Sequence, residues 1–286
     1  MKQRIIGNVQ VGAVGLGGMP MSIEGRPEID RSVRTVHAAL DAGVTLFDTA
    51  DAYHVHADEV GHNETLIAQA LASWGGDTSG VLVATKGGHL RPGDGSWTVD
   101  GSPAHLREAV EGSLKRLGVD AIGLYQFHRP DPRIPYAESV GAVRDLLDEG
   151  KIRLAGISNA NVEQIRQARQ ILGGRLAAVQ NQFSPAFRSS EPELRLCDEL
   201  GIAFLPYSPL GGIARAGELG DRFGEFAGVA AAHGVSPQRV ALAWMLAKSP
   251  HVVPIPGASR PESIIDSARA PELILTGAEQ ARLDAA

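Results

Sequence analysis

The chain repeats one strand-then-helix unit from near its start to its end. Short apolar runs, each followed by apolar residues at helical spacing, occur at 11–16, 44–48, 81–85, 121–127, 152–157, 176–180, 202–206 and 252–255. Near-continuous apolar strands are typical of parallel sheets that are buried on both faces. Eight alternations over roughly 250 residues are the pattern of an α/β fold of the (β/α)₈ TIM-barrel type.

The main alternative is an open, doubly wound parallel sheet. Its first strand should lead through a Gly-x-Gly-x-x-Gly turn directly into a helix. Here Gly15-Leu16-Gly17-Gly18 lacks the third glycine and continues into Met19-Pro20. Residues 3–11 alternate loosely around Gly7-Asn8 and predict a short hairpin ahead of the barrel. No linker or composition break divides the chain, so we expect one domain over residues 1–286.

Composition narrows the class of protein. The 286 residues are 43% apolar and 21% charged, as in an ordinary globular protein, and the net charge of −6 argues against nucleic-acid binding. Cys197 is the only cysteine, which excludes an internal disulfide. No signal-peptide pattern opens the chain, and no apolar run approaches the ~20 residues that span a bilayer. We expect a cytoplasmic protein without a membrane partner, as a monomer or weak homo-oligomer.

Four proton-handling side chains follow three of the predicted strands. Asp48 and Tyr53 follow the strand at 44–48, Lys86 follows 81–85, and His128 follows 121–127. Taken singly, each has a structural explanation, such as a turn-capping Asp or a hydrogen-bonded core His. The carboxyl ends of parallel barrel strands, however, meet at one rim, where such barrels carry their active sites. We therefore predict that the four groups converge.

The predicted chemistry follows from how these groups affect one another. A tyrosine phenol has a pKa of about 10, which an adjacent ammonium lowers. A carboxylate fixes the position of the lysine, and a histidine can donate to a substrate oxygen or relay a proton. Tyr53 with Lys86, Asp48 and His128 would thus protonate a developing alkoxide. Cys197 lies inside a predicted helix and is interpreted as inert packing, so the reductant or electrophile must come from elsewhere.

A metal is one possible source of that reactivity. Metal ligands are available in His54-Val55-His56 with Asp58. Metal-dependent hydrolases and lyases are common among barrels. These residues share a polar loop with Glu59 and His62, which favours a solvated segment, so we expect no metal.

A nicotinamide cofactor fits the remaining strand ends better. Ser158, Asn159 and Gln180 supply hydroxyl and amide partners for a carboxamide. Tyr207 supplies a flat ring for stacking, and 208–212 supplies backbone donors for a pyrophosphate.

Several motifs together resemble one known family. They are Phe47-Asp48-Thr49-Ala50-Asp51-Ala52-Tyr53, Thr85-Lys86, Gln126-Phe127-His128-Arg129-Pro130-Asp131, Gly156-Ile157-Ser158-Asn159, Gln180-Asn181-Gln182, Pro206-Tyr207-Ser208-Pro209-Leu210-Gly211 and Val252-Val253-Pro254-Ile255-Pro256-Gly257-Ala258. In this order they resemble the aldo-keto reductase superfamily over essentially the full chain. The resemblance implies a (β/α)₈ barrel that reduces an aldehyde or ketone with NADPH. It assigns Tyr53 as the general acid, supported by Asp48, Lys86 and His128.

The resemblance also implies a cofactor site. Its residues would be Gly18, Met19, Asp48, Ser158, Asn159, Gln180, Tyr207, Ser208, Pro209, Leu210, Gly211, Pro256, Gly257, Ala258, Ser259 and Arg260. Many family members hold the 2′-phosphate with a Lys-Ser pair and an arginine, and this chain has Gly257-Ala258 and Ser263 at those positions. We expect Ser259 and Arg260 to take over, with NADH as the open alternative.

Within this family, the chain resembles bacterial members and members of the potassium-channel β-subunit type more than the vertebrate aldose-reductase type. A nucleotide-sensing regulatory subunit with little turnover is therefore the alternative function. We expect the substrate pocket to be shaped by the loops 87–101 and 211–228, with Trp97, Phe183 and Phe187. Since the sequence ends soon after Leu283, we also expect that pocket to be comparatively open.

Overall fold

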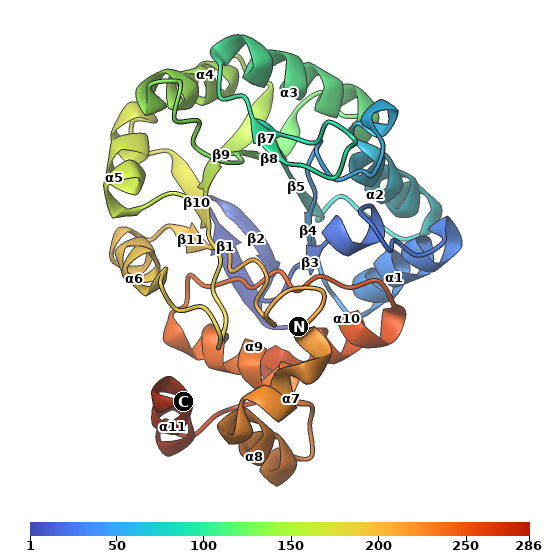
Figure 1. Ribbon diagram of the computed structural model, residues 1–286, viewed down its shortest axis with the longest axis vertical. Coiled ribbons are helices and arrows are strands. Elements are labelled where there is room, and N and C mark those ends of the chain that lie inside the picture. Colours follow the sequence, from blue (N-terminus) through green and yellow to red (C-terminus); the bar gives the residue numbers. More distant parts are fainter.

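Parallel strands form a ring enclosed by helices in the computed structural model, which describes residues 1–286 (Figure 1). Seven of them make one sheet in the order β11-β10-β9-β8-β5-β4-β3, and every pairing is parallel. The strands are β3 (Leu16–Gly17), β4 (Leu46–Asp48), β5 (Leu82–Gly87), β8 (Ile122–Phe127), β9 (Ile152–Ser158), β10 (Leu176–Gln180) and β11 (Ala203–Phe204).

Residues 252–257 occupy the eighth barrel position and join the two edges of the sheet. Parallel bridges connect this segment to Phe204 of β11 and to Gly17 of β3. Pro254 and Pro256 have no N–H to donate, so the segment forms isolated bridges instead of the regular strand expected at 252–255. The carbonyl oxygens of both prolines still accept hydrogen bonds from the N–H groups of Gly15 and Gly17, at 3.0 Å each.

The N-terminal hairpin closes the end of the barrel that lies opposite the carboxyl ends of the strands. It consists of β1 (Gln3–Ile6) and β2 (Val9–Gly12), as expected, but it takes Val11 and Gly12 from the strand predicted at 11–16. Ile6 and Val11 are fully buried against the barrel interior. The interior cluster also contains Leu46, Leu82, Ala84, Leu124, Ala177, Ala178, Ala203, Leu205, Val253 and Ile255. Only the carboxyl ends of the strands remain available for a site.

Eight helices surround the barrel, and three more lie outside the repeating pattern (Figure 1). The surrounding helices are α1 (Ile29–Asp41), α2 (His62–Ser73), α3 (Pro103–Leu117), α4 (Tyr136–Asp148), α5 (Val162–Ile171), α6 (Glu191–Leu200), α9 (Pro237–Lys248) and α10 (Pro261–Ala268). Three helices begin where the sequence predicts, and at each start a hydroxyl accepts a hydrogen bond from a backbone N–H. These hydroxyls belong to Ser102, Ser236 and Thr276. None of the helices is long and apolar enough to cross a membrane.

The additional helices are α7 (Leu219–Arg222), α8 (Gly224–His233) and α11 (Gly277–Ala285). The first two fall mostly in the segment 211–228, which we had expected to be a loop. The sequence of α8 is rich in alanine and glycine and lacks a clear apolar stripe, so periodicity gave no signal there. Its few large apolar residues, Phe226 and Val229, are buried against the core.

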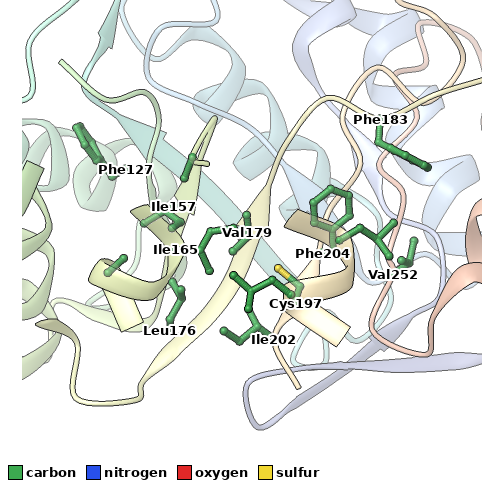
Figure 2. Close-up of a cluster of buried hydrophobic side chains, with 14 of the residues drawn as sticks. Phe127, Ile157, Ile165, Leu176, Val179, Phe183, Cys197, Ile202, Phe204 and Val252 are labelled. Atoms are coloured by element: carbon green, nitrogen blue, oxygen red, sulfur yellow. The ribbon is translucent and has the colours of Figure 1, made fainter. Parts of the chain in front are cut away.

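The largest core lies between the strands and the helices on one side of the barrel. Figure 2 shows Cys197 within it, among Val179, Ile202 and Phe204. Burial raises the pKa of the Cys197 thiol to about 12, which confirms its interpretation as packing. Phe183 belongs to the same core and stacks on Trp244 with ring centroids 5.5 Å apart.

Candidate active site

A cavity of about 880 Å³ opens at the carboxyl ends of the barrel strands. Residues that follow β4, β8, β9, β10, β11 and the closing segment line it together. From the predicted tetrad, Asp48, Tyr53 and His128 line the cavity, whereas Lys86 is fully buried directly beneath it. The predicted convergence of the four groups is thus present.

Lys86 is the centre of this arrangement. It belongs to the end of β5 itself, one position further into the strand than expected. Its Nζ donates to Asp48 Oδ1 at 2.6 Å, to the Thr49 carbonyl oxygen at 2.9 Å and to the Tyr53 hydroxyl at 3.0 Å. These contacts satisfy all three protons of a fully buried ammonium, which fixes it behind the phenol.

Two glutamines hold the second oxygen of Asp48. The Nε2 of Gln180 donates to Asp48 Oδ2 at 2.7 Å, and the Nε2 of Gln126 approaches the same oxygen at 3.4 Å. Asp48 therefore cannot rotate away from Lys86 without losing other bonds. Gln126 was missed by the sequence reasoning, although it directly precedes the Phe127-His128 motif and pairs in register with Lys86.

The phenol of Tyr53 differs from expectation in its pKa. Burial raises this pKa, and that effect outweighs the lowering by the adjacent Lys86 ammonium, while Asp48 adds to the rise. We had expected the lysine to make the phenol more acidic than usual overall. The structure instead holds Tyr53 as a neutral phenol with an available proton at neutral pH, which is the form that a general acid needs.

The imidazole of His128 is also held neutral. Burial lowers its pKa well below the ordinary value, and Lys86, His89 and Arg129 lower it further. Its ring lies 5.9 Å from the Tyr53 ring, centroid to centroid, in an edge arrangement at 83°. A neutral imidazole next to the phenol can donate one hydrogen bond to an oxygen but carries no charge to repel Lys86.

Asn159 and Tyr207 form a second connected group on the cavity wall. The Asn159 amide nitrogen donates to the His128 carbonyl oxygen at 3.0 Å, and the Tyr207 hydroxyl donates to Asn159 Oδ1 at 2.8 Å. The Ser158 hydroxyl donates to the Gln180 carbonyl oxygen at 2.7 Å. Asn159 and Ser208 have positive φ values of 57° and 48°, a strained conformation that is concentrated at functional sites.

The far end of the cavity suits a phosphate. Ser259, Arg260 and Ser263 line it where α10 begins, and Arg260 Nε donates to the Ser263 hydroxyl at 2.8 Å. A Cβ at Gly257 would lie 2.7 Å from Pro20 Cγ, so only glycine allows this close approach of the two loops. With amides and an aromatic ring near the acid and a guanidinium beyond, the donor set fits a nicotinamide dinucleotide.

Most of the cofactor residues predicted from the resemblance line the cavity. They are Met19, Asp48, Ser158, Asn159, Gln180, Tyr207, Ser208, Pro209, Leu210, Gly257, Ala258, Ser259 and Arg260. Gly18, Gly211 and Pro256 do not, while the neighbouring Gly17 and Gly212 do. The carbonyl oxygen of Gly18 accepts from the Asn63 amide at 2.9 Å, so this glycine supports the loop behind the cavity.

The excursion at 87–101 walls the cavity, as expected. It contains the short strands β6 (His89–Leu90) and β7 (Thr98–Val99), and Trp97 stacks on His89 with ring centroids 4.7 Å apart. The guanidinium of Arg91 lies 4.7 Å from the centre of the Trp97 ring and pairs with Glu24. His89 is a lining residue that the sequence reasoning missed; burial lowers its pKa to about 4.

Two expectations about the pocket walls are wrong. Phe183 lies in the hydrophobic core, and Phe187 is 37% exposed but does not line the cavity. Both belong to the segment between β10 and α6. The segment at 211–228 does contribute, through Gly212, Ile213, Ala216 and Gly217.

Side chains of the histidine-rich loop at 54–62 are engaged in contacts with other protein groups. His54 Nδ1 is bonded to the His56 carbonyl at 2.7 Å, and Glu59 pairs with Arg26 at 2.7 Å. No group of three His, Cys, Asp or Glu side chains in the chain is arranged to hold a metal ion.

Comparison with known proteins identifies the family. Residues 13–286 match the model of the aldo/keto reductase family. The chain belongs to this family. This membership confirms the resemblance seen in the sequence, and this aldo/keto reductase is accordingly an oxidoreductase.

Relatives and solved structures agree with that assignment. An uncharacterized oxidoreductase of Schizosaccharomyces pombe is 32% identical over 98% of this chain and 88% of its own length. The glycerol dehydrogenase of Gluconobacter oxydans is 28% identical with a TM-score of 0.85, covering 99% of this chain and 94% of its own. An aldo/keto reductase of Klebsiella pneumoniae, solved with NADP and acetate, is 28% identical with a TM-score of 0.83, covering 100% and 95%. These neighbours confirm the predicted barrel fold.

Proposed function

We propose that this aldo/keto reductase reduces an aldehyde or ketone to an alcohol with NADPH, and that Tyr53 is the general acid. The observation that carries the proposal is the Tyr53 hydroxyl. It lies at a cavity wall, accepts a hydrogen bond from a fully buried Lys86 at 3.0 Å, and stays protonated at neutral pH. The solved complexes of Klebsiella pneumoniae relatives with NADP and with NADPH support the choice of cofactor.

The cofactor would lie along the lining residues from Asn159 to Arg260. Asn159 and Gln180 supply amide groups for a carboxamide, and the half-buried Tyr207 supplies a ring for stacking. Ser259 and Arg260 supply donors for a phosphate beside the start of α10. When bound, a reduced nicotinamide supplies hydride.

The side chains of this enzyme would manage the proton and the developing negative charge. A substrate carbonyl oxygen between Tyr53 and His128 accepts a hydrogen bond from each, which stabilises charge as it forms on that oxygen. The proton of the Tyr53 hydroxyl then moves to the oxygen. Lys86 stabilises the resulting phenolate across 3.0 Å, and Asp48 keeps the ammonium in place.

Replacement of the phenol tests this proposal. Tyr53→Phe should lower kcat for carbonyl reduction by roughly 10²- to 10⁴-fold, the usual contribution of general acid catalysis. NADPH affinity, measured by fluorescence titration, should stay within about twofold of wild type because the ring is kept. Tyr136→Phe is the matched control, since the Tyr136 hydroxyl is buried and the residue does not line the cavity.

Undiminished reduction by Tyr53→Phe would refute the assignment. A wild-type protein that binds NADPH tightly but reduces none of a broad panel of aldehydes and ketones would instead favour the nucleotide-sensing alternative.

The preference between NADPH and NADH depends on Arg260. Arg260→Gln should weaken NADPH binding about tenfold, because a charged hydrogen-bond donor to the 2′-phosphate is lost, and leave NADH binding unchanged. Arg269→Gln, at the other end of α10, is the control for loss of surface charge. Equal changes for both nucleotides, or none, would exclude this role for Arg260.

A further inference from the structure

Arg129 is a cation in the cavity with no anion beside it. It directly follows His128 at the end of β8, lines the cavity, and is half-buried. It takes part in no ion pair, and its Nε is buried without a hydrogen-bond partner. A buried donor on a charged group is costly when nothing accepts from it. The missing acceptor therefore points to a ligand.

No other residue of the cavity can neutralise Arg129. Asp48 is the only acidic residue among the lining side chains, and its charge is already paired with Lys86 at 2.6 Å. The ionisable groups influenced by the charge of Arg129 are His89, His128 and Tyr207, and none of them is negatively charged at neutral pH. Burial raises the pKa of Tyr207 while Arg129 opposes that rise, which places the guanidinium beside the Tyr207 phenol. The cavity around the acid thus carries a net positive charge that only a bound anion can balance.

The phosphate end of the cavity is too far around the barrel to supply that anion. Arg260 follows the closing segment 252–257, which bridges β11 and β3. Two strands lie between β8 and each of these edge strands, so Arg129 and Arg260 lie on opposite sides of the barrel mouth. Figure 1 shows β8 across the ring from α9 and α10. A dinucleotide phosphate held at Arg260 leaves Arg129 free, on the side of His128 and His89.

We propose that Arg129 binds an anionic oxygen group of the substrate, so that the preferred substrates are carbonyl compounds that also carry a carboxylate or a similar oxyanion. This inference rests on the proposed reductase function and specifies its substrate class. A guanidinium presents several donors in a planar fork that matches a carboxylate. Held there, the carboxylate would orient the carbonyl of the same molecule towards Tyr53 and His128.

The test compares charged and neutral substrates of equal size. The probes are the ortho, meta and para carboxybenzaldehydes, each paired with its formylbenzamide, in which the carboxylate is replaced by a neutral amide. Wild type should reduce at least one carboxybenzaldehyde with a kcat/KM on the order of 10- to 100-fold above that of its amide. The favoured isomer reports the spacing between the charge and the carbonyl carbon.

Variants of Arg129 then locate the effect. Arg129→Gln should remove that preference through a higher KM for the carboxylate, with the amide substrate and the NADPH dissociation constant changed less than about threefold. Arg129→Lys should restore part of the preference, because the charge remains but the fork is lost. Arg166→Gln, an exposed arginine on α5 that forms no ion pair, should behave as wild type.

Each remaining outcome decides against the inference. Equal rates for all charged and neutral pairs in wild type would overturn it while leaving the reductase function intact. Loss of NADPH binding in Arg129→Gln would assign the residue to the cofactor. The wild-type comparison is informative even if a variant fails to fold. Failure to reduce any probe, charged or neutral, would count against the proposed function itself.

Discussion

Asp48 and Asp51 stand three positions apart in one segment and have opposite environments. Both are buried, with 3% and 4% of their surfaces exposed. Asp48 forms an ion pair with Lys86 and accepts from Gln180 through its other oxygen. Asp51 does not line the cavity, and its Oδ1 has no hydrogen-bond partner.

The surroundings of Asp51 explain why its carboxyl group stays protonated. The nearby arginine, Arg116, already bonds Glu64 Oε2 at 2.6 Å, and Thr85 donates to Glu64 Oε1 at 2.5 Å. Burial therefore raises the pKa of Asp51 to about 8, and the charge of Glu64 adds to the rise. Equal burial thus has two results. A carboxylate with a cation of its own becomes a fixed part of the acid site, whereas one without a cation retains its proton.

Removing Lys86, the cation paired with Asp48, should have the largest effect on stability and activity. Lys86→Met leaves Asp48 buried without a countercharge, so the free energy of unfolding should fall by roughly 3–5 kcal/mol. Adding Asp48→Asn should recover most of that loss, because no unpaired charge remains, yet carbonyl reduction should stay impaired in both variants. Urea unfolding and kcat/KM measure the two effects. A double variant as unstable as Lys86→Met would contradict the pairing that distinguishes Asp48 from Asp51.

The proton held by Asp51 should affect the pH dependence of stability. Below pH ~4 both the folded and the unfolded states hold the Asp51 proton. Between that value and about 8 the unfolded state releases it while the folded state keeps it, so the contribution of Asp51 to wild-type stability falls as pH rises. Asp51→Asn removes this dependence, and its stability relative to wild type should increase by ~3 kcal/mol from pH 5 to pH 8.

Urea unfolding at several pH values measures this change, and Asp58→Asn, a surface substitution, is its control. A relative stability of Asp51→Asn that is constant across the range would show that Asp51 is ionised in the folded protein. Because Asp51 does not line the cavity, kcat/KM of Asp51→Asn should stay within about threefold of wild type.

Asp48 and Asp51 also show which features of the site can be predicted from the sequence. Strand ends can be read from apolar runs, and parallel strands bring their ends together, so the meeting of Asp48, Tyr53, Lys86 and His128 was predictable. The barrel followed from the same alternation. What the sequence could not provide is the balance of burial and charge. Nothing in the local sequence around Asp51 indicates that Arg116, on α3, is already engaged by Glu64.

The remaining misses have similar physical causes. The net direction of the Tyr53 pKa shift depends on how deeply the phenol is buried, which no motif encodes. The closing segment lacks a regular strand because its two prolines have no backbone donors, an effect that the apolar pattern alone does not show. His89 reaches the cavity from the short hairpin of β6 and β7, where its ring stacks on Trp97, a contact that the sequence does not reveal.

The pH profile of carbonyl reduction tests the central claim most directly. If the neutral phenol of Tyr53 supplies the proton and His128 stays neutral, kcat/KM with saturating NADPH should be flat between about pH 6 and 9, because neither group changes its charge in that range. Tyr53→Phe should be nearly inactive throughout. An inflection near pH 6.5 that disappears in His128→Gln, with activity retained in Tyr53→Phe, would show that the histidine is the acid and would contradict the role assigned to Tyr53.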